Sequence, residues 1–404
     1  NTIGRMFVER TDEIYRNMRN PKFLRAYYRM KTASMLIGNK VEGSSPPDIF
    51  VGSYGYPNVY IGPLIPPRFG ETEILSEPEQ WPGKDMLEII EMRTALVRGM
   101  YRTRVTDVDS GRTEEMITEL AIASRNVESE ATFLHAPAFN PSFDDISQPF
   151  GPSAMLKDLQ IGNIKADRRI ERAYYDTDMP AKEAILELYN DGTPVSRIQK
   201  ALAGGALGLS KKRKFVPTRW SITAVDDTIS KDALAEVKSY EPIDYIAAYE
   251  NDALDNRWLI MMLPGIWSYE LIEAWYPRTA WNASSERIAI YSSHEFFGGR
   301  TTYAEIGGCY YAARLATSEL LKRIRRQATV VILREIHEGY IMPVGVWNVR
   351  EHVREALKKK PLIFESMKSL FDHVKKRMAI PVEAWVQNSA MLQYILRQRK
   401  LTDY

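Results

Sequence analysis

Apolar and polar residues in the first half of the chain follow mostly helical spacing, with one interruption. In the helical stretches the hydrophobic side chains recur with the period of an amphipathic helix. Residues Glu42 to Phe69 are instead rich in proline, glycine and aromatic residues, a composition that favours short strands and fixed turns. The helices predicted in this half are 11–35, 85–103, 113–132, 167–175, 180–190 and 195–203.

Beyond Lys214 the pattern changes to short strand-like runs that alternate with helical segments. These runs are rich in β-branched and aromatic residues, which pack well on a pleated sheet. The predicted strands are 220–225, 245–249, 258–263, 287–291 and 329–336, and the predicted helices are 307–326, 349–359 and 363–378. We therefore predict an α+β protein. A helical N-terminal domain with a Pro/Gly-rich strand–loop insert precedes a C-terminal domain with helices on a mixed, largely antiparallel sheet.

This change of pattern also sets the predicted domain boundary. Several glycines precede the basic run Lys211-Lys212-Arg213-Lys214, and both features are typical of a segment between domains. We expect a mostly helical N-terminal domain at 1–210, an α+β domain at 211–397 and a binding motif at 398–404. Two domains also suit a chain of 404 residues, which is too long for one small core.

The charge balance limits how the protein can meet nucleic acid. Its 54 basic and 52 acidic side chains nearly cancel, so DNA binding would depend on local basic clusters and not on a net positive field. The single cysteine, Cys309, cannot form an internal disulfide or a cysteine zinc site, which suits a reducing cytoplasm. No apolar run approaches the ~20 residues that a membrane-spanning helix needs. We therefore expect a cytoplasmic protein that is not embedded in a membrane.

Three passages that lie far apart in the chain resemble the archaeal Nre proteins. They are Pro46 to Pro67, Phe215 to Asp227 and Gly339 to Glu351, so the resemblance covers nearly the whole chain. It implies a role in the repair of DNA damage. NreA-type members of this family end in a motif that binds the sliding clamp (PCNA), so the resemblance implies the clamp as a partner. Some members also carry an N-terminal cysteine-rich motif that suggests zinc, and this chain lacks those cysteines.

The last residues of the chain match most of a clamp-binding motif. Such motifs present Gln-x-x-aliphatic-x-x-aromatic-aromatic, and here Gln398, Leu401 and Tyr404 occupy the first three of these positions. Leucine and tyrosine three residues apart project on the same side of a 3₁₀ turn, where they can fill an apolar pocket. The second aromatic residue is missing. The alternative is that Tyr404 only ends an amphipathic helix that begins at Val382.

A helix-turn-helix over residues 180–203 is a candidate DNA contact. Its second helix would lie in the major groove and offer Ser196, Arg197, Gln199 and Lys200 to the bases. Basic residues nearby would bind phosphates, which gives affinity without sequence preference and suits a repair factor. A plain helical hairpin with a solvated basic loop is the alternative. The DNA-binding candidates are Arg197, Lys200, Lys211, Lys212, Arg213, Lys214 and Arg219.

Several histidine and acidic residues are candidates for catalysis, although no catalytic motif has diagnostic spacing. Two such groups follow predicted strands, where imidazole and carboxylate together would suit a divalent metal of the kind that nucleases use. The alternative is that these side chains are buried and paired with neighbours. The candidates are His294, Glu295, His337, Asp226 and Asp227, with Glu338 as a further metal ligand, and the sequence identifies neither a metal nor another cofactor.

Three classes of function fit these features. The first is a recruitment protein that its tail holds on the sliding clamp while it acts on or near damaged DNA. In such a protein the tyrosines of the Tyr54 to Asn58 loop would stack on bases. The alternative is that this loop only stabilises the fold. The second is a metal-dependent nuclease or another nucleotide-processing enzyme delivered by the same tail. The third is a structural partner in a larger assembly, which scattered basic clusters would favour.

Overall fold

The computed structural model describes residues 21–139, 144–282 and 286–402, and they form two compact units. The first, called the N-unit, spans residues 25–229; the second, called the C-unit, comprises 230–402 together with 21–24. Each unit contains a six-stranded sheet and packed helices, so the predicted α+β class is confirmed. No helix in the described part of the chain is both long and apolar enough to cross a bilayer.

The N-unit is built on a six-stranded sheet with the strand order β1-β5-β6-β4-β3-β2. All neighbouring strands are antiparallel except the parallel pair β4–β6. Apolar residues of one sheet face, such as Val59 and Ile61, pack against α4 in a common core. The strands are β1 (Lys40–Ser45), β2 (Ile49–Val51), β3 (Asn58–Ile65), β4 (Val97–Arg104), β5 (Val127–Phe133) and β6 (Ser153–Ile161).

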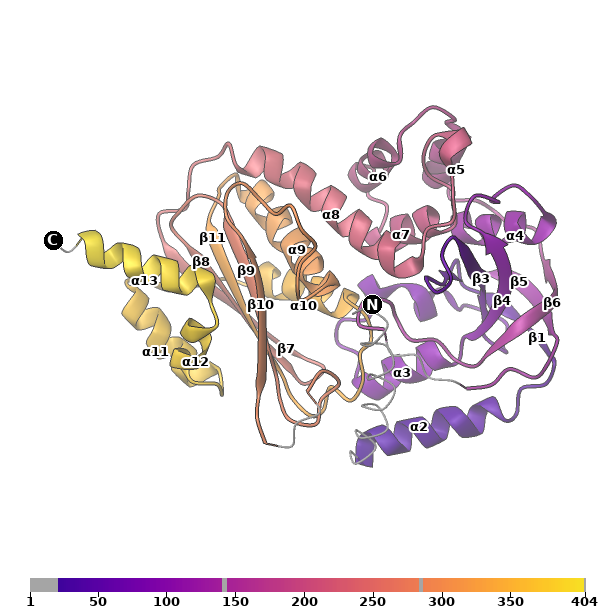
Figure 1. Cartoon of the computed structure of the whole chain (residues 1–404), viewed down its shortest axis with the longest axis horizontal. Coiled ribbons are helices and arrows are strands. Elements are labelled where there is room, and N and C mark those ends of the chain that lie inside the picture. The colour runs from indigo at the N-terminus through magenta and orange to yellow at the C-terminus, as the bar shows by residue number, and fades with distance from the viewer. Residues whose placement is uncertain (1–20, 140–143, 283–285, 403–404) are drawn as a thin grey trace. The chain divides into compact units, whose positions relative to one another are not determined.

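Helices pack around this sheet (Figure 1), and the boundaries between the two units, at residues 24/25 and 229/230, fall within α2 and α8. The helices are α2 (Pro21–Ser34), α3 (Met86–Thr94), α4 (Arg112–Ile122), α5 (Arg168–Tyr175), α6 (Ala181–Asn190), α7 (Val195–Ala203) and α8 (Thr218–Val237). Short 3₁₀ turns occupy η1 (Glu73–Ser76), η2 (Pro78–Gln80) and η3 (Ser210–Lys212). The predicted helices at 167–175, 180–190 and 195–203 are confirmed.

Two predicted helices of the N-unit are wrong in their second halves. The helix expected over 85–103 ends at Thr94, and β4 follows it; the helix expected over 113–132 ends at Ile122, and β5 follows. In β4 and β5 burial tends to alternate between neighbouring residues, as in a half-buried strand. Short apolar runs fit both periods, and here pairing with neighbouring strands decides. The predicted strand–loop insert is thus part of a full sheet.

The C-unit contains a second sheet, with the order β10-β9-β11-β8-β7-β12. Only the pair β9–β11 is parallel, so the predicted largely antiparallel sheet is confirmed. The strands are β7 (Ile246–Ala253), β8 (Asn256–Leu263), β9 (Ser268–Trp275), β10 (Ala289–Glu295), β11 (Thr329–Ile336) and β12 (Leu362–Phe364).

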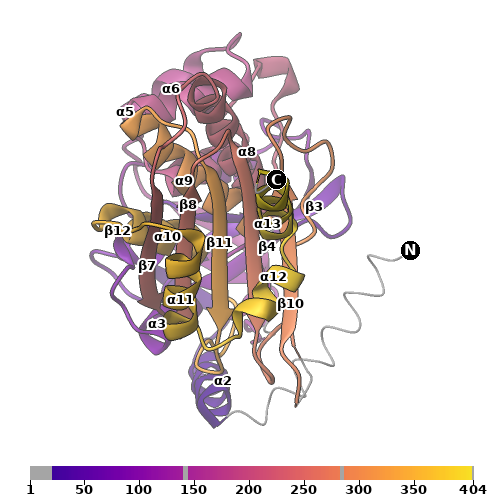
Figure 2. The same ribbon diagram turned by 90° about the vertical axis from the view of Figure 1, so that its left-hand side faces the viewer.

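Helices cover both faces of this sheet. Figure 1 shows α9 (Gly308–Ile324) and α10 (Trp347–Lys358) on one face, and Figure 2 looks onto the other face, which carries α11 (Met367–Arg377), α12 (Val382–Gln387) and α13 (Ala390–Thr402). The predicted strand 220–225 is wrong because these residues lie in α8. Ser221, Ile222 and Val225 are buried there at helical spacing, which outweighs the strand propensity of the run.

Candidate nucleic-acid interface

Three segments that are distant in sequence meet at the tip of the β2–β3 hairpin in the N-unit. The tip turns at Gly55, whose φ of 81° favours glycine over any residue with a side chain. The Val105 N–H donates to the Pro57 oxygen at 2.9 Å, and the Phe215 N–H donates to the Val105 oxygen at 2.8 Å. The end of β4 and the segment that ends at Phe215 therefore lie beside the hairpin tip.

The first turn of α8 is attached to the same hairpin. The Val51 N–H donates to Thr218 Oγ1 at 2.9 Å. Two residues further on, the Trp220 ring packs on the Tyr56 ring with a centroid distance of 5.0 Å and a tilt of 54°. Two of the passages that resemble the Nre proteins are thus joined at this point.

Aromatic side chains at the hairpin tip are unusually exposed. Tyr54 exposes 89% of its surface, Trp220 exposes 45% and Tyr56 exposes 44%. The Trp220 and Tyr56 rings each cover part of the other, whereas the Tyr54 ring is almost fully exposed to solvent. Exposed aromatic faces of this kind are suited to stacking on bases.

Exposed basic residues belong to two of the segments that meet at the hairpin tip. Arg102 and Arg104 of β4 are exposed, because they lie on the sheet face opposite Gly99 and Thr103, which are buried. Three lysines of the predicted basic run are also exposed. The exposed cations of the two segments are therefore Arg102, Arg104, Lys211, Lys212 and Lys214. None of them forms an ion pair with another described residue.

Arg98 lies on the same sheet face as Arg102 and is held between two aromatic rings. Its guanidinium carbon is 4.2 Å from the centre of the Phe50 ring and 4.9 Å from that of Phe150. Its Nε is buried without a hydrogen-bond partner, and burial alone lowers the pKa of Arg98 to about 10. No carboxylate of the described residues compensates this cation.

The arginines of β4 are absent from the predicted DNA contacts because their segment was expected to be helical. Arg98, Arg102 and Arg104 occupy even positions of the strand, so their spacing in steps of two was the available signal. We call the half-buried Arg98 and the exposed residues of these segments the hairpin-tip surface: Tyr54, Tyr56, Trp220, Arg98, Arg102, Arg104, Lys211, Lys212 and Lys214.

Two other predicted DNA contacts at this end have partners within the N-unit. The Arg213 guanidinium donates to the oxygens of Gly208 at 2.9 Å and Asp176 at 3.1 Å. Arg219 lies 3.7 Å from Asp144 and 3.6 Å from Asp145. Asp107 and Asp109 also follow β4 closely and reduce the positive charge at this end of the strand.

The exposed recognition helix predicted at 195–203 is wrong. Every residue of α7 is buried, including Ser196 and Gln199. Arg197 donates to the Pro47 oxygen at 2.8 Å and to the Ala123 oxygen, and Lys200 donates to the Ser76 oxygen. Both cations thus bind carbonyl groups inside the N-unit, where they cannot reach a DNA groove.

The candidate catalytic pair His294–Glu295 is divided between the two faces of the C-unit sheet. Glu295 is buried and accepts hydrogen bonds from Trp267 Nε1 at 2.9 Å, the Tyr310 hydroxyl at 2.8 Å and Arg314 Nη1 at 2.8 Å. His294, the preceding residue on β10, is half-buried on the opposite face. Glu295 is thereby held as a structural carboxylate.

The remaining acid–base candidates have the following neighbours within their own units. His337 Nε2 is 3.2 Å from Glu335 Oε2, and its ring stacks on Tyr276 at 4.2 Å. Glu338 is exposed and accepts a hydrogen bond from Arg278. In the N-unit, Asp226 is fully buried and accepts from Gln199 Nε2 at 3.2 Å, and Asp227 is half-buried.

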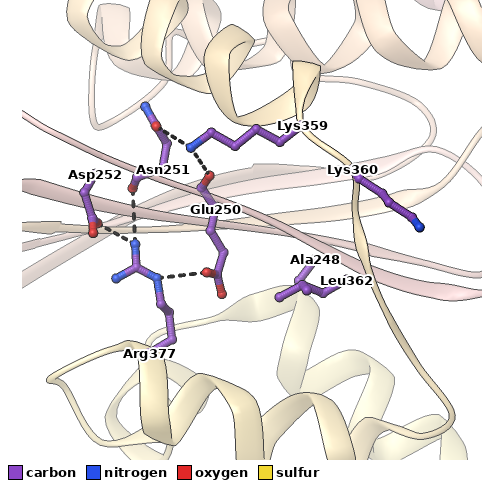
Figure 3. Close-up of a pocket in the computed structure, with 8 residues that line it drawn as sticks. All are labelled: Ala248, Glu250, Asn251, Asp252, Lys359, Lys360, Leu362 and Arg377. Carbon is purple, nitrogen blue, oxygen red and sulfur yellow. Dashed lines mark hydrogen bonds and ion pairs between the residues drawn. The ribbon is translucent and has the colours of Figure 1, made fainter. Parts of the chain in front are cut away.

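No group of three or more histidine, cysteine or acidic residues is placed to hold a metal ion in the described part of the chain. A polar pocket of about 500 Å³ does occur in the C-unit, at the edge formed by β7 and β12 (Figure 3). Its lining residues are Ala248, Glu250, Asn251, Asp252, Lys359, Lys360, Leu362 and Arg377.

The charges in this pocket largely satisfy one another. Arg377 donates to Glu250 at 3.2 Å and to Asp252, and Lys359 donates to Asn251 Oδ1 at 2.8 Å (Figure 3). These bonds tie α11 and the end of α10 to β7. The pocket is therefore best understood as an ion-pair cluster that closes the edge of the sheet.

The predicted clamp-binding residues lie at the end of the chain. Gln398 and Leu401 belong to the helical backbone of α13, and Tyr404 falls outside the described residues. The helix expected from Val382 is divided into α12 and α13, which are separated at Asn388 and Ser389. The role of Gln398, Leu401 and Tyr404 stays a prediction.

Family models and curated relatives match the chain along most of its length. The model described as archaeal Nre, N-terminal, matches residues 19–282, and the model described as archaeal Nre, C-terminal, matches residues 295–404. DNA repair protein NreB of Archaeoglobus fulgidus is 42% identical over 363 residues, which cover 90% of this chain and 91% of that protein.

Two further relatives are named DNA repair protein NreA. The protein from Archaeoglobus fulgidus is 35% identical over 374 residues, 91% of each chain. The protein from Haloferax volcanii is 35% identical over 329 residues, 79% of this chain and 78% of that one. No solved structure shows significant similarity to the chain.

Proposed function

This chain belongs to the archaeal Nre family, and from that membership we propose that it acts in DNA repair. In this proposal it binds DNA through the hairpin-tip surface, and Gln398, Leu401 and Tyr404 bind the sliding clamp. The relatives' names support the repair role, and the geometry of the N-unit supports the contact with DNA.

The observation that carries the DNA contact is that two segments that meet at the hairpin tip, the end of β4 and 211–215, carry exposed cations for which no ion pair occurs among the described residues. Arg102 and Arg104 come from β4, and the exposed lysines come from a segment that follows more than a hundred residues later. The formal net charge of the chain is only +2, so a local cluster is needed to attract a polyanion. Contacts between cations and phosphates need no particular base sequence, which suits a protein that must act wherever damage occurs.

The DNA contact is tested by removing two of these charges. We expect the double variant Arg102→Gln/Arg104→Gln to bind every DNA sequence more weakly, and the slope of log K against log salt for a duplex to fall by about 1.8. Fluorescence anisotropy at several salt concentrations measures both quantities. The control, Lys368→Gln/Lys375→Gln, removes two exposed charges of α11 in the C-unit and should leave the affinity and the salt slope unchanged. Wild-type affinity and slope in the first variant would contradict the proposed surface.

Clamp binding is tested by calorimetric titration of the full chain into the sliding clamp. The buried leucine and tyrosine of a short anchored peptide supply enough apolar area for micromolar affinity. We expect Leu401→Ala/Tyr404→Ala to abolish the heat of binding. Tyr394→Ala is the control, because this exposed α13 residue precedes the motif. Equal binding by the first variant would show that the tail is only a helix end.

We advance no catalytic role, because no feature of the described residues favours the nuclease alternative. His294 and Glu295 lie on opposite faces of the C-unit sheet, and no group of three or more histidine, cysteine or acidic side chains among the described residues is placed to hold a metal ion. The nuclease hypothesis stays a prediction. The proposed function consists of recruitment to the sliding clamp and binding to DNA.

A further inference from the structure

The hairpin-tip surface carries more exposed aromatic area than a contact with DNA phosphates needs. We infer that it is a stacking platform for the unpaired bases of single-stranded DNA, with Arg98 as a cation for the backbone beside it. This inference rests on the proposed function and deepens it, because it specifies which form of DNA the surface prefers.

The stacking surfaces are the Tyr54 ring and the packed pair of Tyr56 and Trp220. Tyr54 is 89% exposed, so both faces of its ring are open to a base. In the pair, the rings are 5.0 Å apart and each still exposes close to half of its surface, which leaves an outer face on the pair. Every base has a flat π-face, so such rings bind unpaired bases without regard to sequence.

The occupant is single-stranded because a duplex hides the faces of its bases. In a double helix the bases stack on one another and present only their edges and the phosphates. Aromatic side chains at the tip of a hairpin gain little from those groups. A strand with unpaired bases offers both the faces that Tyr54 and Trp220 would stack on and the phosphates that Arg102 and Arg104 would attract.

Arg98 lacks an anion in a position where an anion would be stabilising. Its guanidinium lies between Phe50 and Phe150, with Nε buried and without a hydrogen-bond partner. A buried polar group without a partner is costly, and a phosphate can accept hydrogen bonds from a guanidinium. Gly52 leaves this space open, since a Cβ there would lie 3.4 Å from Arg98 Nη2.

Gly52 also connects the cation to the aromatic rings. Gly52 lies two residues before Tyr54, and its N–H donates to the Tyr60 oxygen at 2.8 Å. The Arg98 guanidinium therefore lies beside the strand that leads into the hairpin tip. One strand of nucleic acid can therefore place a phosphate near Arg98 and neighbouring bases on the rings. The same face continues to Arg102 and Arg104 on β4.

The experiment compares a labelled oligothymidine of about 12 nucleotides with a duplex of the same length, using the full chain and fluorescence anisotropy. We expect Tyr54→Ala and Trp220→Ala each to bind the oligothymidine about tenfold more weakly, with little change for the duplex. Their salt slopes should equal that of the wild type, because no charge is lost. Trp220→Phe should restore most of the affinity.

Arg98→Met separates the phosphate contact from a packing role. Its affinity for the oligothymidine should fall and its salt slope should decrease by about 0.7, whereas its melting temperature should equal or exceed that of the wild type. A lower melting temperature with an unchanged salt slope would overturn the role of Arg98. Phe69→Ala, which removes a ring that is 61% exposed elsewhere in the N-unit, is the control and should bind like the wild type.

The outcomes distinguish the two proposals. If the wild type binds DNA but Tyr54→Ala and Trp220→Ala bind the oligothymidine as tightly, the platform is overturned and the proposed function stands. Equal losses on the oligothymidine and the duplex would likewise overturn a preference for unpaired bases. Failure of the wild type to bind either DNA overturns both. Tyr54→Ala is the decisive variant, because a ring this exposed contributes little to folding.

Discussion

Most charged side chains in the interior of this protein are held by partners that satisfy their hydrogen bonds. In the N-unit, Arg93 donates to Asp48 at 3.0 Å and to the Leu75 oxygen at 2.8 Å, and Ser76 donates to Asp48 at 2.7 Å. Buried charges need such partners, because an unpaired ion loses its hydration energy on burial. Arg98 departs from this rule, and for that reason we propose that it binds a phosphate group of single-stranded DNA.

Glu295 tests whether a predicted catalytic residue serves the structure. We expect Glu295→Gln to lower the free energy of unfolding by about 3 kcal/mol, since it removes the buried negative charge that pairs with the Arg314 cation at 2.8 Å. The control is Glu338→Gln, whose exposed pair with Arg278 should be worth less than about 1 kcal/mol. Urea denaturation measures both. A fully stable Glu295→Gln protein that fails to support repair in cells would instead indicate catalysis.

Lys200 gives the N-unit a stability that depends on pH. Burial lowers the pKa of Lys200 from 10.5 to about 8, while Asp48, 3.8 Å away, opposes this effect. Between these two values the unfolded chain holds a proton that the folded chain has released, so stability rises with pH in that window and is lower below pH 8.

The prediction is a difference between the wild type and Lys200→Met. From about pH 7.5 to about pH 10, the wild type should gain about 2 kcal/mol relative to this variant. Urea denaturation at both pH values measures the gain, and subtraction of the variant removes the titration of other groups. Lys182→Met, at an exposed site, should follow the wild type. The same pH response in all three proteins would show that Lys200 titrates normally.

At the scale of elements, the surroundings of a helix decide what its polar residues do. In α7 the basic residues turn inward and bind carbonyl groups of three separate segments. In α13 the polar groups fix the start of the helix. The Leu392 N–H donates to Ser389 Oγ at 2.9 Å, and the N–H groups of Ala390 and Met391 donate to Glu270 of β9. Together, Ser389 and Glu270 attach the helix that contains Gln398 and Leu401, two of the residues proposed to bind the clamp.

Loss of this cap should loosen α13. We expect Ser389→Ala to cost about 1 kcal/mol and to speed hydrogen exchange of the amides at 393–397. Ser366→Ala is the matched control, because Ser366 caps α11 by accepting from the Ser369 N–H at 3.2 Å. Its effect on exchange should be confined to α11. Unchanged exchange in α13 of the Ser389 variant would mean that packing alone fixes the helix.

At the scale of the whole molecule, each unit has its own apolar core, and charge is distributed locally. The N-unit core lies between its sheet and α4, and the C-unit core lies between its sheet and α11 to α13. The formal net charge of the chain is only +2, so the chain as a whole creates no strong positive field. The hairpin-tip surface is therefore a local feature of the N-unit, and clamp binding is proposed for the far end of the C-unit chain.

The sequence by itself determined the α+β class, several elements and the family. The strand 329–336 and the helix 195–203 were predicted with their observed bounds, because long runs with one clear period specify an element locally. Exposed lysines at 211, 212 and 214 also followed from a polar run between elements. The passages that resemble the Nre proteins lie within the ranges that the family models match.

The tertiary structure decided which face of each helix and strand is exposed to solvent. Residues 97–104 became a strand because β3 and β6 pair with them, and no local pattern specifies such partners. Arg197 is buried because Pro47, 150 residues earlier, supplies its acceptor. The hairpin-tip surface likewise exists only where 53–57, 98–104 and 211–220 meet. Sequence periodicity describes one element at a time, whereas burial and clustering depend on contacts between elements that are far apart in the chain.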